Sequence, residues 1–293
     1  MAAFAHHGDM HSANCRNAPH FSAPRAEGLR LAGTYRRDVR ASLARIWENV
    51  FDWEHLPSLH ASSFAACTLI DRGRWGWRVR LVNQPGDPAR ANVLEMEADK
   101  ARNRYLVVTL EGPGTGSEIR VQLTPRAAHE TGVLVEFHVP ETDPERLQQI
   151  GARYAQVYRH LWDEDEAMMR AREKALRRRR TSAPGIKRLG AEAAVRARAP
   201  FTVTYAGKPV RVAVLDGAMI AFSAECPHWR GPLDETPLVD GCVTCRWHGY
   251  RFDVRSGESA DGRGLRLAPA PQLRLIDGAV CLVPPESGGA LPR

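Results

Sequence analysis

Apolar and polar residues alternate over much of positions 29–139, which predicts strands of an antiparallel sheet with one buried face. The pattern is clearest from Trp75 to Leu81, where apolar side chains at every second position would share one face. Turns rich in Gly, Pro and Asp separate several of these runs. The predicted strands are 29–35, 65–71, 75–82, 92–99, 105–110, 118–124 and 133–139.

Helical patterns flank the strands on both sides. We predict a helix at about 38–49, a short one at about 52–60 and a long one at about 144–178. Pro144 suits the first turn of the long helix, because proline has no backbone N–H to leave unpaired there.

The rest of the chain has a different pattern. Residues 196–284 contain short strands with frequent Gly and Pro, which predicts a small all-β domain. A length of 293 residues agrees with two domains. We interpret 1–28 as a flexible lead, 29–180 as the first domain, 181–195 as a linker and 285–293 as a tail.

The net charge of +7 is concentrated rather than spread, with four consecutive arginines at 177–180. No aromatic residues are interleaved with this run, so we interpret it as the cationic end of a helix and predict no nucleic-acid partner. No stretch approaches the ~18 apolar residues of a membrane span, and the first 28 residues lack the apolar core of a secretory signal. We therefore expect a cytoplasmic protein without a membrane partner.

Two short motifs combine cysteine with histidine: Cys226-Pro-His228 and Cys245-Arg-Trp-His248, with 16 residues between them. Two facing loops of this kind could offer two thiolates to one iron and two imidazoles to another, which is the ligand set of a Rieske-type [2Fe–2S] cluster. A zinc site is the alternative, since zinc accepts the same side chains. Zinc fingers usually pair Cys with Cys and His with His, so the pattern favours the cluster.

The surroundings of these motifs resemble the Rieske domains of oxygenases and ferredoxins, including Gly231-Pro232 and the run from Gly249 to Asp253. Respiratory Rieske proteins add a disulfide between the two loops, but no Cys closely follows His228 here. The resemblance therefore implies an oxygenase-type centre of lower potential. Cys242 is interpreted as a small loop residue.

A second metal site is suggested by His55 and His60. On a regular helix these two side chains would diverge by about 140°, but Pro57 lies between them and could distort the helix enough to turn both toward one point. Asp52 precedes His55 by three residues and could accept a hydrogen bond from its second ring nitrogen. Both histidines could equally be ordinary pocket residues without a metal.

A mononuclear iron site of this type also needs a carboxylate. The long helix carries the acidic run 163–166, beside an apolar stripe at helical spacing. Asp165 falls inside that stripe, Glu164 lies at its edge, and Asp163 and Glu166 are predicted to point away. Because a buried carboxylate is costly unless it is paired or bound to metal, Asp165 is the predicted ligand.

The order of elements in 29–178 resembles the helix-grip fold of the START-like (SRPBCC) superfamily, which implies an α+β protein. In that fold a curved antiparallel sheet wraps a long C-terminal helix and leaves a ligand cavity. The stretch from Asn49 to His60 resembles the iron motif of Rieske non-heme iron oxygenases. There, two histidines bind Fe(II) and an aspartate connects them to a cluster histidine of a neighbouring Rieske domain. The resemblance gives these roles to His55, His60 and Asp52, with His228 or His248 as the partner.

Taken together, the resemblances imply a mono- or dioxygenase in which the cluster feeds electrons to Fe(II) for the O₂-dependent hydroxylation or demethylation of an apolar or aromatic substrate. No G-x-G-x-x-G fingerprint is present, so a separate NAD(P)H-dependent reductase or ferredoxin would supply the electrons. The family implies a homo-oligomer, usually a head-to-tail trimer. Oxygenase subunits of the family place the Rieske domain first, whereas in this chain it comes second. This reversal leaves open whether the cluster serves its own chain or a neighbouring one. The alternatives are a non-catalytic ligand-binding domain fused to a Rieske electron carrier, and a redox sensor.

Overall fold

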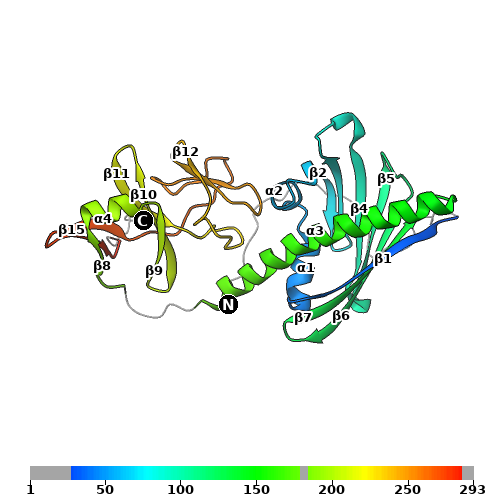
Figure 1. Cartoon of the computed structure of the whole chain (residues 1–293), viewed down its shortest axis with the longest axis horizontal. Helices are drawn as coiled ribbons and strands as arrows, with labels where there is room; N and C mark the ends of the chain where they lie inside the picture. Colours follow the sequence, from blue (N-terminus) through cyan, green and yellow to red (C-terminus); the bar gives the residue numbers. More distant parts are fainter. Residues whose placement is uncertain (1–27, 179–183, 286–293) are drawn as a thin grey trace, which may run out of the picture.

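The computed structural model describes residues 28–178 and 184–285, which form two domains that meet along one long helix (Figure 1). In the N-terminal domain, seven antiparallel strands form one sheet in the order β1-β7-β6-β5-β4-β3-β2. The strands are β1 (Arg30–Val39), β2 (Phe64–Gly73), β3 (Gly76–Asn83), β4 (Asn92–Asp99), β5 (Arg104–Glu111), β6 (Glu118–Ala127) and β7 (Glu130–Val139). The helices are α1 (Leu43–Phe51), α2 (Leu56–Leu59) and α3 (Pro144–Arg177), with single 3₁₀ turns at Pro88–Arg90 and Lys100–Arg102.

Helix α3 runs across one face of the sheet, as Figure 1 shows, and the main core lies between the two. Phe137 and Val135 of β7 are fully buried in this core, together with Trp162 and Met169 of α3. The helix approaches β1 very closely at Gly151, where a Cβ atom would lie 2.0 Å from the carbonyl oxygen of Ala32. The predicted α+β class and helix-grip arrangement are confirmed.

The predicted start of the first helix was wrong by five residues. Positions 38 and 39 continue β1, because Asp38 and Val39 pair with Gly132 and Thr131 of β7. Helix α1 begins only after Ser42, whose hydroxyl accepts a hydrogen bond from the backbone N–H of Arg45 at 3.3 Å.

The predicted second helix also differs from the structure. Helix α2 is a single turn, with His55 at its N-cap and His60 at its C-cap. Pro57 lies in the first turn, where proline is well tolerated, and does not interrupt a longer helix. The two histidines therefore flank one turn of helix and need no kink to face the same side.

The C-terminal domain consists of three small three-stranded sheets and one short helix. Its elements are β8 (Lys187–Ala191), α4 (Glu192–Arg198), β9 (Phe201–Tyr205), β10 (Lys208–Leu215), β11 (Ala218–Ser223), β12 (Leu238–Val239), β13 (Cys242–Thr244), β14 (Arg251–Asp253), β15 (Gln272–Ile276) and β16 (Ala279–Val283). The predicted small all-β domain is confirmed.

Two local predictions for this domain need correction. Much of the predicted linker 181–195 is structured, since β8 pairs with β16 and α4 follows it directly. Cys242 is not a loop residue but the buried first residue of β13. The predicted lead and tail lie outside the described residues, apart from Gly28 and Pro285.

Within the ranges 28–178 and 184–285, no helix is long and apolar enough to cross a bilayer.

Candidate metal centres

The four predicted cluster residues come together from two loops of the C-terminal domain. Cys226 and His228 follow β11, and Cys245 and His248 lie between β13 and β14. The imidazole rings of His228 and His248 are 4.5 Å apart between centroids, and the thiols of Cys226 and Cys245 are close enough to shift each other's pKa. Both cysteines are almost completely buried.

Backbone hydrogen bonds shape each loop into a tight turn. The N–H of Cys226 donates to the carbonyl of Gly231 and the N–H of Cys245 donates to the carbonyl of Tyr250, both at 2.8 Å. Gly231 is required where the loops meet, because a Cβ atom there would lie 2.9 Å from the Trp247 ring and 3.0 Å from Sγ of Cys245.

The polar atoms of this centre are suited to ligate metal. Nδ1 of His228 and Nδ1 of His248 are buried and have no hydrogen-bond partner among the described residues. Such atoms are destabilising unless they find a partner or a ligand. Interaction with the Cys226 thiol lowers the pKa of Cys245 against the opposing effect of burial. Two sulfurs and two free imidazole nitrogens match the donor set of a Rieske centre.

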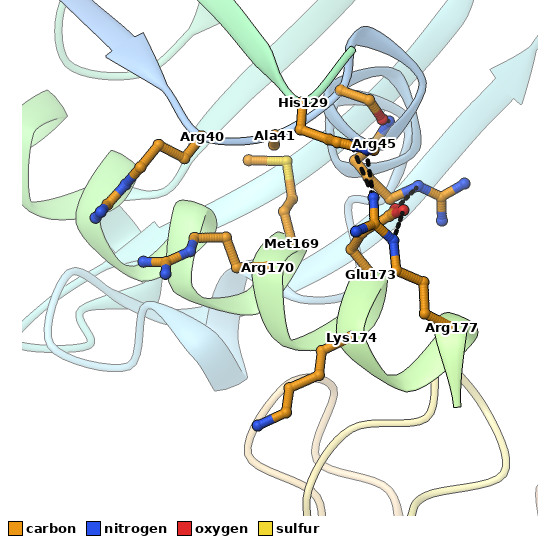
Figure 2. A pocket seen from close by; sticks show the side chains of 10 residues that line it. Arg40, Ala41, Arg45, His129, Met169, Arg170, Glu173, Lys174 and Arg177 are labelled. Atoms are coloured by element: carbon orange, nitrogen blue, oxygen red, sulfur yellow. Dashed lines mark hydrogen bonds and ion pairs between the residues drawn. The ribbon is translucent and has the colours of Figure 1, made fainter. Parts of the chain in front are cut away.

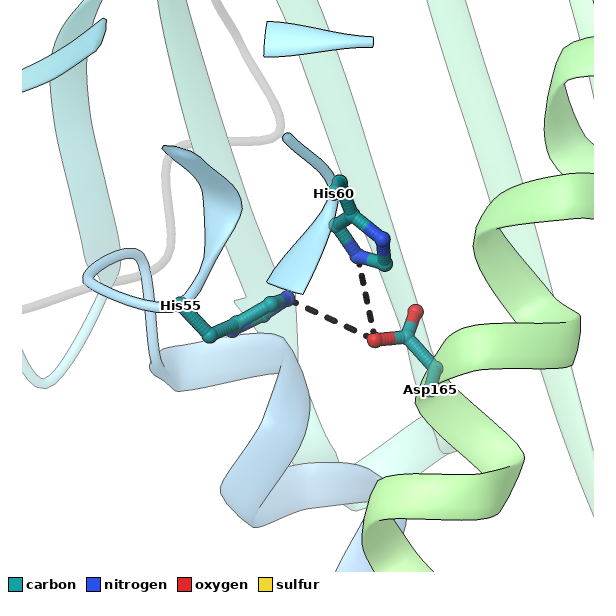
Figure 3. Close-up of side chains that lie close together, drawn as sticks. All are labelled: His55, His60 and Asp165. Atoms are coloured by element: carbon teal, nitrogen blue, oxygen red, sulfur yellow. Dashed lines mark ion pairs between the residues drawn. The ribbon is translucent and has the colours of Figure 1, made fainter. Parts of the chain in front are cut away.

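A second group of potential ligands lies in the N-terminal domain. His55, His60 and Asp165 are all buried, and one donor atom from each lies within 4.8 Å of the other two. Nε2 of His60 is 3.2 Å and Nε2 of His55 is 3.5 Å from Oδ1 of Asp165. Figure 3 shows both rings directed from either end of α2 toward the carboxylate on α3.

The two separations from Asp165 are close to those expected around a single metal ion. Donor atoms that bind one first-row metal at about 2.1 Å stand about 3.0–3.4 Å apart when the angle between them is 90–109°. Asp165 is held in place by Asn49, whose side-chain amide donates to Oδ1 at 2.9 Å. Two histidines and one carboxylate are the ligand set of mononuclear non-heme iron sites.

Each of these histidines is oriented by a second carboxylate. Nδ1 of His60 donates to Oε2 of Glu164 at 2.7 Å, and Nδ1 of His55 lies 3.3 Å from Oδ2 of Asp52. Since an ionised carboxylate only accepts hydrogen bonds, Nδ1 of His60 carries a proton, and the Nε2 atoms of both rings face Asp165. Burial opposes the charged form of His60, but Asp165 and Glu164 outweigh it and raise its pKa.

The two centres meet at Asp52. Oδ2 of Asp52 accepts a hydrogen bond of 2.6 Å from Nε2 of His248 and also faces His55. The Asp52 side chain is only 8% exposed. Burial would raise its pKa, but the hydrogen bond from His248 and the nearby His55 ring hold the pKa well below its ordinary value. The sequence did not decide whether His228 or His248 is the partner of Asp52, and in the structure it is His248 that forms this hydrogen bond.

The other acids of α3 behave partly as expected. Asp163 is exposed, as predicted, but Glu166 is buried and was wrongly predicted to point away. Arg37 and Arg40 hold it through hydrogen bonds at 2.7 and 2.8 Å, which compensates its burial.

Sequence reasoning missed several contacts between the domains. The hydroxyl of Tyr250 donates to Glu54 at 2.8 Å, and the guanidinium of Arg172 donates to the backbone carbonyl of Trp229 at 2.9 Å. Tyr250 also stacks on His228, with ring centroids 4.4 Å apart. No local pattern marks these pairs, although Tyr250 and Glu54 each lie close in sequence to a predicted ligand.

A pocket of about 320 Å³ lies where α3 passes the start of α1 (Figure 2). Its walls carry several cations, among them Arg45, Arg170 and Lys174, above the buried side chain of Met169. None of the predicted ligands lines it. It is therefore not the expected substrate cavity beside the triad.

Comparison with known proteins agrees with the division of the chain into two domains. Residues 186–270 match the family model described as the Rieske [2Fe-2S] domain. The C-terminal domain is thus a Rieske domain, which supports a [2Fe–2S] cluster rather than zinc. No curated protein sequence matches the chain.

Solved structures resemble each domain separately. A START superfamily protein from Mycobacterium smegmatis is 20% identical, with 47% of this chain and 95% of that chain covered and a TM-score of 0.38. The Zhui aromatase/cyclase from Streptomyces sp. R1128 is 16% identical, with 51% and 98% covered and a TM-score of 0.42. The ferredoxin of carbazole 1,9a-dioxygenase from Nocardioides aromaticivorans IC177 is 20% identical, with 34% and 99% covered and a TM-score of 0.31.

Proposed function

We propose that this chain is a Rieske-type oxygenase component that hydroxylates or demethylates an apolar or aromatic small molecule. The proposed ligands of the [2Fe–2S] cluster are Cys226, His228, Cys245 and His248, and those of a mononuclear Fe(II) are His55, His60 and Asp165. When bound, the cluster supplies single electrons and the iron supplies open positions at which O₂ is activated. The observation that carries the proposal is Asp52, which contacts a histidine from each centre.

Asp52 would fix the proton positions of both rings. As an ionised acceptor it requires a proton on Nε2 of His248, and it would favour one on Nδ1 of His55, which lies 3.3 Å away. The opposite nitrogen of each ring, Nδ1 of His248 and Nε2 of His55, is then free to bind metal. One buried carboxylate would thus prepare a ligand for each centre and contact both.

The surroundings of the triad favour an apolar substrate. Phe64 lies edge-on to His60, with ring centroids 6.1 Å apart. Tyr105 is buried and Tyr158 is half-buried, and burial raises the pKa of both phenols, with smaller contributions from a neighbouring tyrosine and from Asp165. These neutral aromatic side chains would bind and orient an apolar or aromatic molecule and exclude water. A separate NAD(P)H-dependent reductase or ferredoxin would supply the electrons.

Metal analysis of the purified chain tests the proposal. We expect about three iron atoms and two acid-labile sulfides per chain when both centres are filled. His55→Ala should lower this to about two iron atoms while the visible absorption of the cluster stays unchanged. His129→Ala, which changes an exposed histidine away from both centres, is the matched control.

Turnover is tested by oxygen uptake with a generic reductase and a panel of aromatic and methylated compounds. Substrate-dependent uptake in the wild type and its loss in His55→Ala would support the oxygenase. A chain that turns over fully with two irons would exclude the mononuclear site. A chain that binds the compounds without oxygen uptake would be a ligand-binding domain fused to an electron carrier.

A further inference from the structure

Helix α3 belongs to both domains at once. Met169 is buried in the core of the N-terminal domain, whereas its neighbour Met168 is buried in the core of the C-terminal domain. Consecutive residues of a helix point about 100° apart, so two faces of one helix serve two cores. The same helix carries Asp165 of the triad one turn earlier. The position of the Rieske domain is thus coupled to a ligand of the other centre.

Polar contacts surround the point where the two centres meet. Arg172 of α3 donates to the carbonyl of Trp229, next to His228, and its guanidinium lies 4.5 Å from the Trp229 ring centroid. On the loop that carries His248, Tyr250 donates to Glu54, two residues after Asp52. Gly249 touches α2 so closely that a Cβ atom would lie 2.9 Å from Oγ of Ser58. The loop of one domain is therefore fitted to the histidine segment of the other.

The connection between the domains is short. Helix α3 ends at Arg177 and β8 begins at Lys187, so nine residues, 178–186, lie between them. Nine residues reach at most about 30 Å. Such a tether holds the Rieske domain beside its own α3 at an effective concentration on the order of millimolar, far above the roughly micromolar concentration of separate chains in solution. Contact within the chain is favoured over the same contact between chains.

We propose that the two centres of a single chain form the working pair, so that the site is complete without a second copy. This inference rests on the proposed function. A cluster held by Cys226, His228, Cys245 and His248 would supply single electrons to an iron held by His55, His60 and Asp165 of the same chain, and a separate one-electron donor protein would replace them. Asp52 acts here as a positioning residue, because it contacts both His248 and His55.

The reversed domain order gives this arrangement a physical reason. With the Rieske domain placed after α3, the helix that ends the first domain also packs against the second through Met168 and Arg172, close to the loop whose His248 reaches Asp52. A neighbouring subunit is then unnecessary, and the trimer implied by the resemblance is not required for activity.

Mixing two inactive variants tests the inference. His55→Ala keeps the cluster and disables the triad, whereas His228→Ala keeps the triad and disables the cluster. If electrons pass within one chain, the mixture shows no more turnover than the sum of the two variants alone. A wild-type and His55→Ala mixture, expected to show only the activity of its wild-type share, is the control. Recovery of activity in the mixture of the two variants would overturn the proposal.

A second measurement uses the unaltered protein and needs no turnover. Sedimentation should give the mass of a single chain, and hydrogen exchange should show the same protection of amides 52–60 over about a thousandfold dilution. Loss of this protection on dilution would mean that another chain supplies the contact, and the inference would fall. Persistent protection in a chain that never consumes oxygen would disprove the proposed function but leave the single-chain arrangement intact.

Discussion

Glu164 provides the sharpest test of the triad, because it touches a proposed ligand without being one. Its Oε2 accepts the hydrogen bond from Nδ1 of His60 at 2.7 Å, and the His60 side chain is only 1% exposed. Removing such a partner typically lowers metal affinity 10- to 100-fold, or about 1.4–2.7 kcal/mol. Glu164→Gln keeps an acceptor oxygen and loses only the charge, so we expect roughly a 10-fold loss. Glu164→Ala removes the bond and should lose about 100-fold.

The affinity is measured by anaerobic titration of Fe(II), or of Co(II) as a spectroscopic probe, against a chelator of known strength. The cluster absorption reports that the other centre is intact. Asp163→Asn is the matched control, because Asp163 is the preceding residue of α3, is 59% exposed and pairs with Arg37 rather than with the triad. Equal affinity in wild type and Glu164→Ala would refute the idea that Glu164 orients His60 for metal. An equal loss in Asp163→Asn would attribute the effect to the charge of the helix.

Three further predictions concern stability. Burial and the neighbouring Glu95 raise the pKa of Glu97 to about 7. The folded state therefore holds this proton more tightly than the unfolded state, and the free energy of unfolding falls as pH rises from 4.5 toward 7. In urea titrations, Glu97→Gln should be more stable than wild type by about 1 kcal/mol at pH 8, after allowance for solvent screening, and equally stable at pH 4. Met168→Ala opens a cavity in the Rieske core beside α3 and should lower the unfolding free energy by about 2–5 kcal/mol, measured by denaturant unfolding; an unchanged midpoint would mean that α3 does not stabilise that core. Trp77→Phe leaves a buried backbone carbonyl of α1 without its 2.8 Å hydrogen bond and should lower the unfolding free energy by about 1–3 kcal/mol. An equal loss from Trp75→Phe, at a half-buried position two residues earlier, would contradict this reason.

Much of the fold could be predicted because its signals are local. Alternation of apolar residues located all seven strands of the large sheet to within a few residues, and helical spacing located α3. The start of α1 was missed because residues 38 and 39 join a strand more than 90 positions away, and no local pattern reports such a pairing. Glu166 was misplaced for the same reason, since its partners Arg37 and Arg40 lie on another element.

The sequence by itself determined which residues could bind metal. Cysteine and histidine spacing marked the four candidates of the Rieske domain, and the apolar stripe of α3 singled out Asp165 from its acidic neighbours. Both inferences depend only on side-chain chemistry and on the repeat of one helix or loop, which neighbouring residues specify.

Only the tertiary structure decided which of these residues meet. Asp52 and His248 are 196 positions apart, and the choice between His228 and His248 depends on how the loops of one domain pack against α2 and α3 of the other. Contacts between residues so far apart in sequence form because two hydrophobic cores that share helix α3 bury apolar side chains from many segments. No single segment of the chain encodes them.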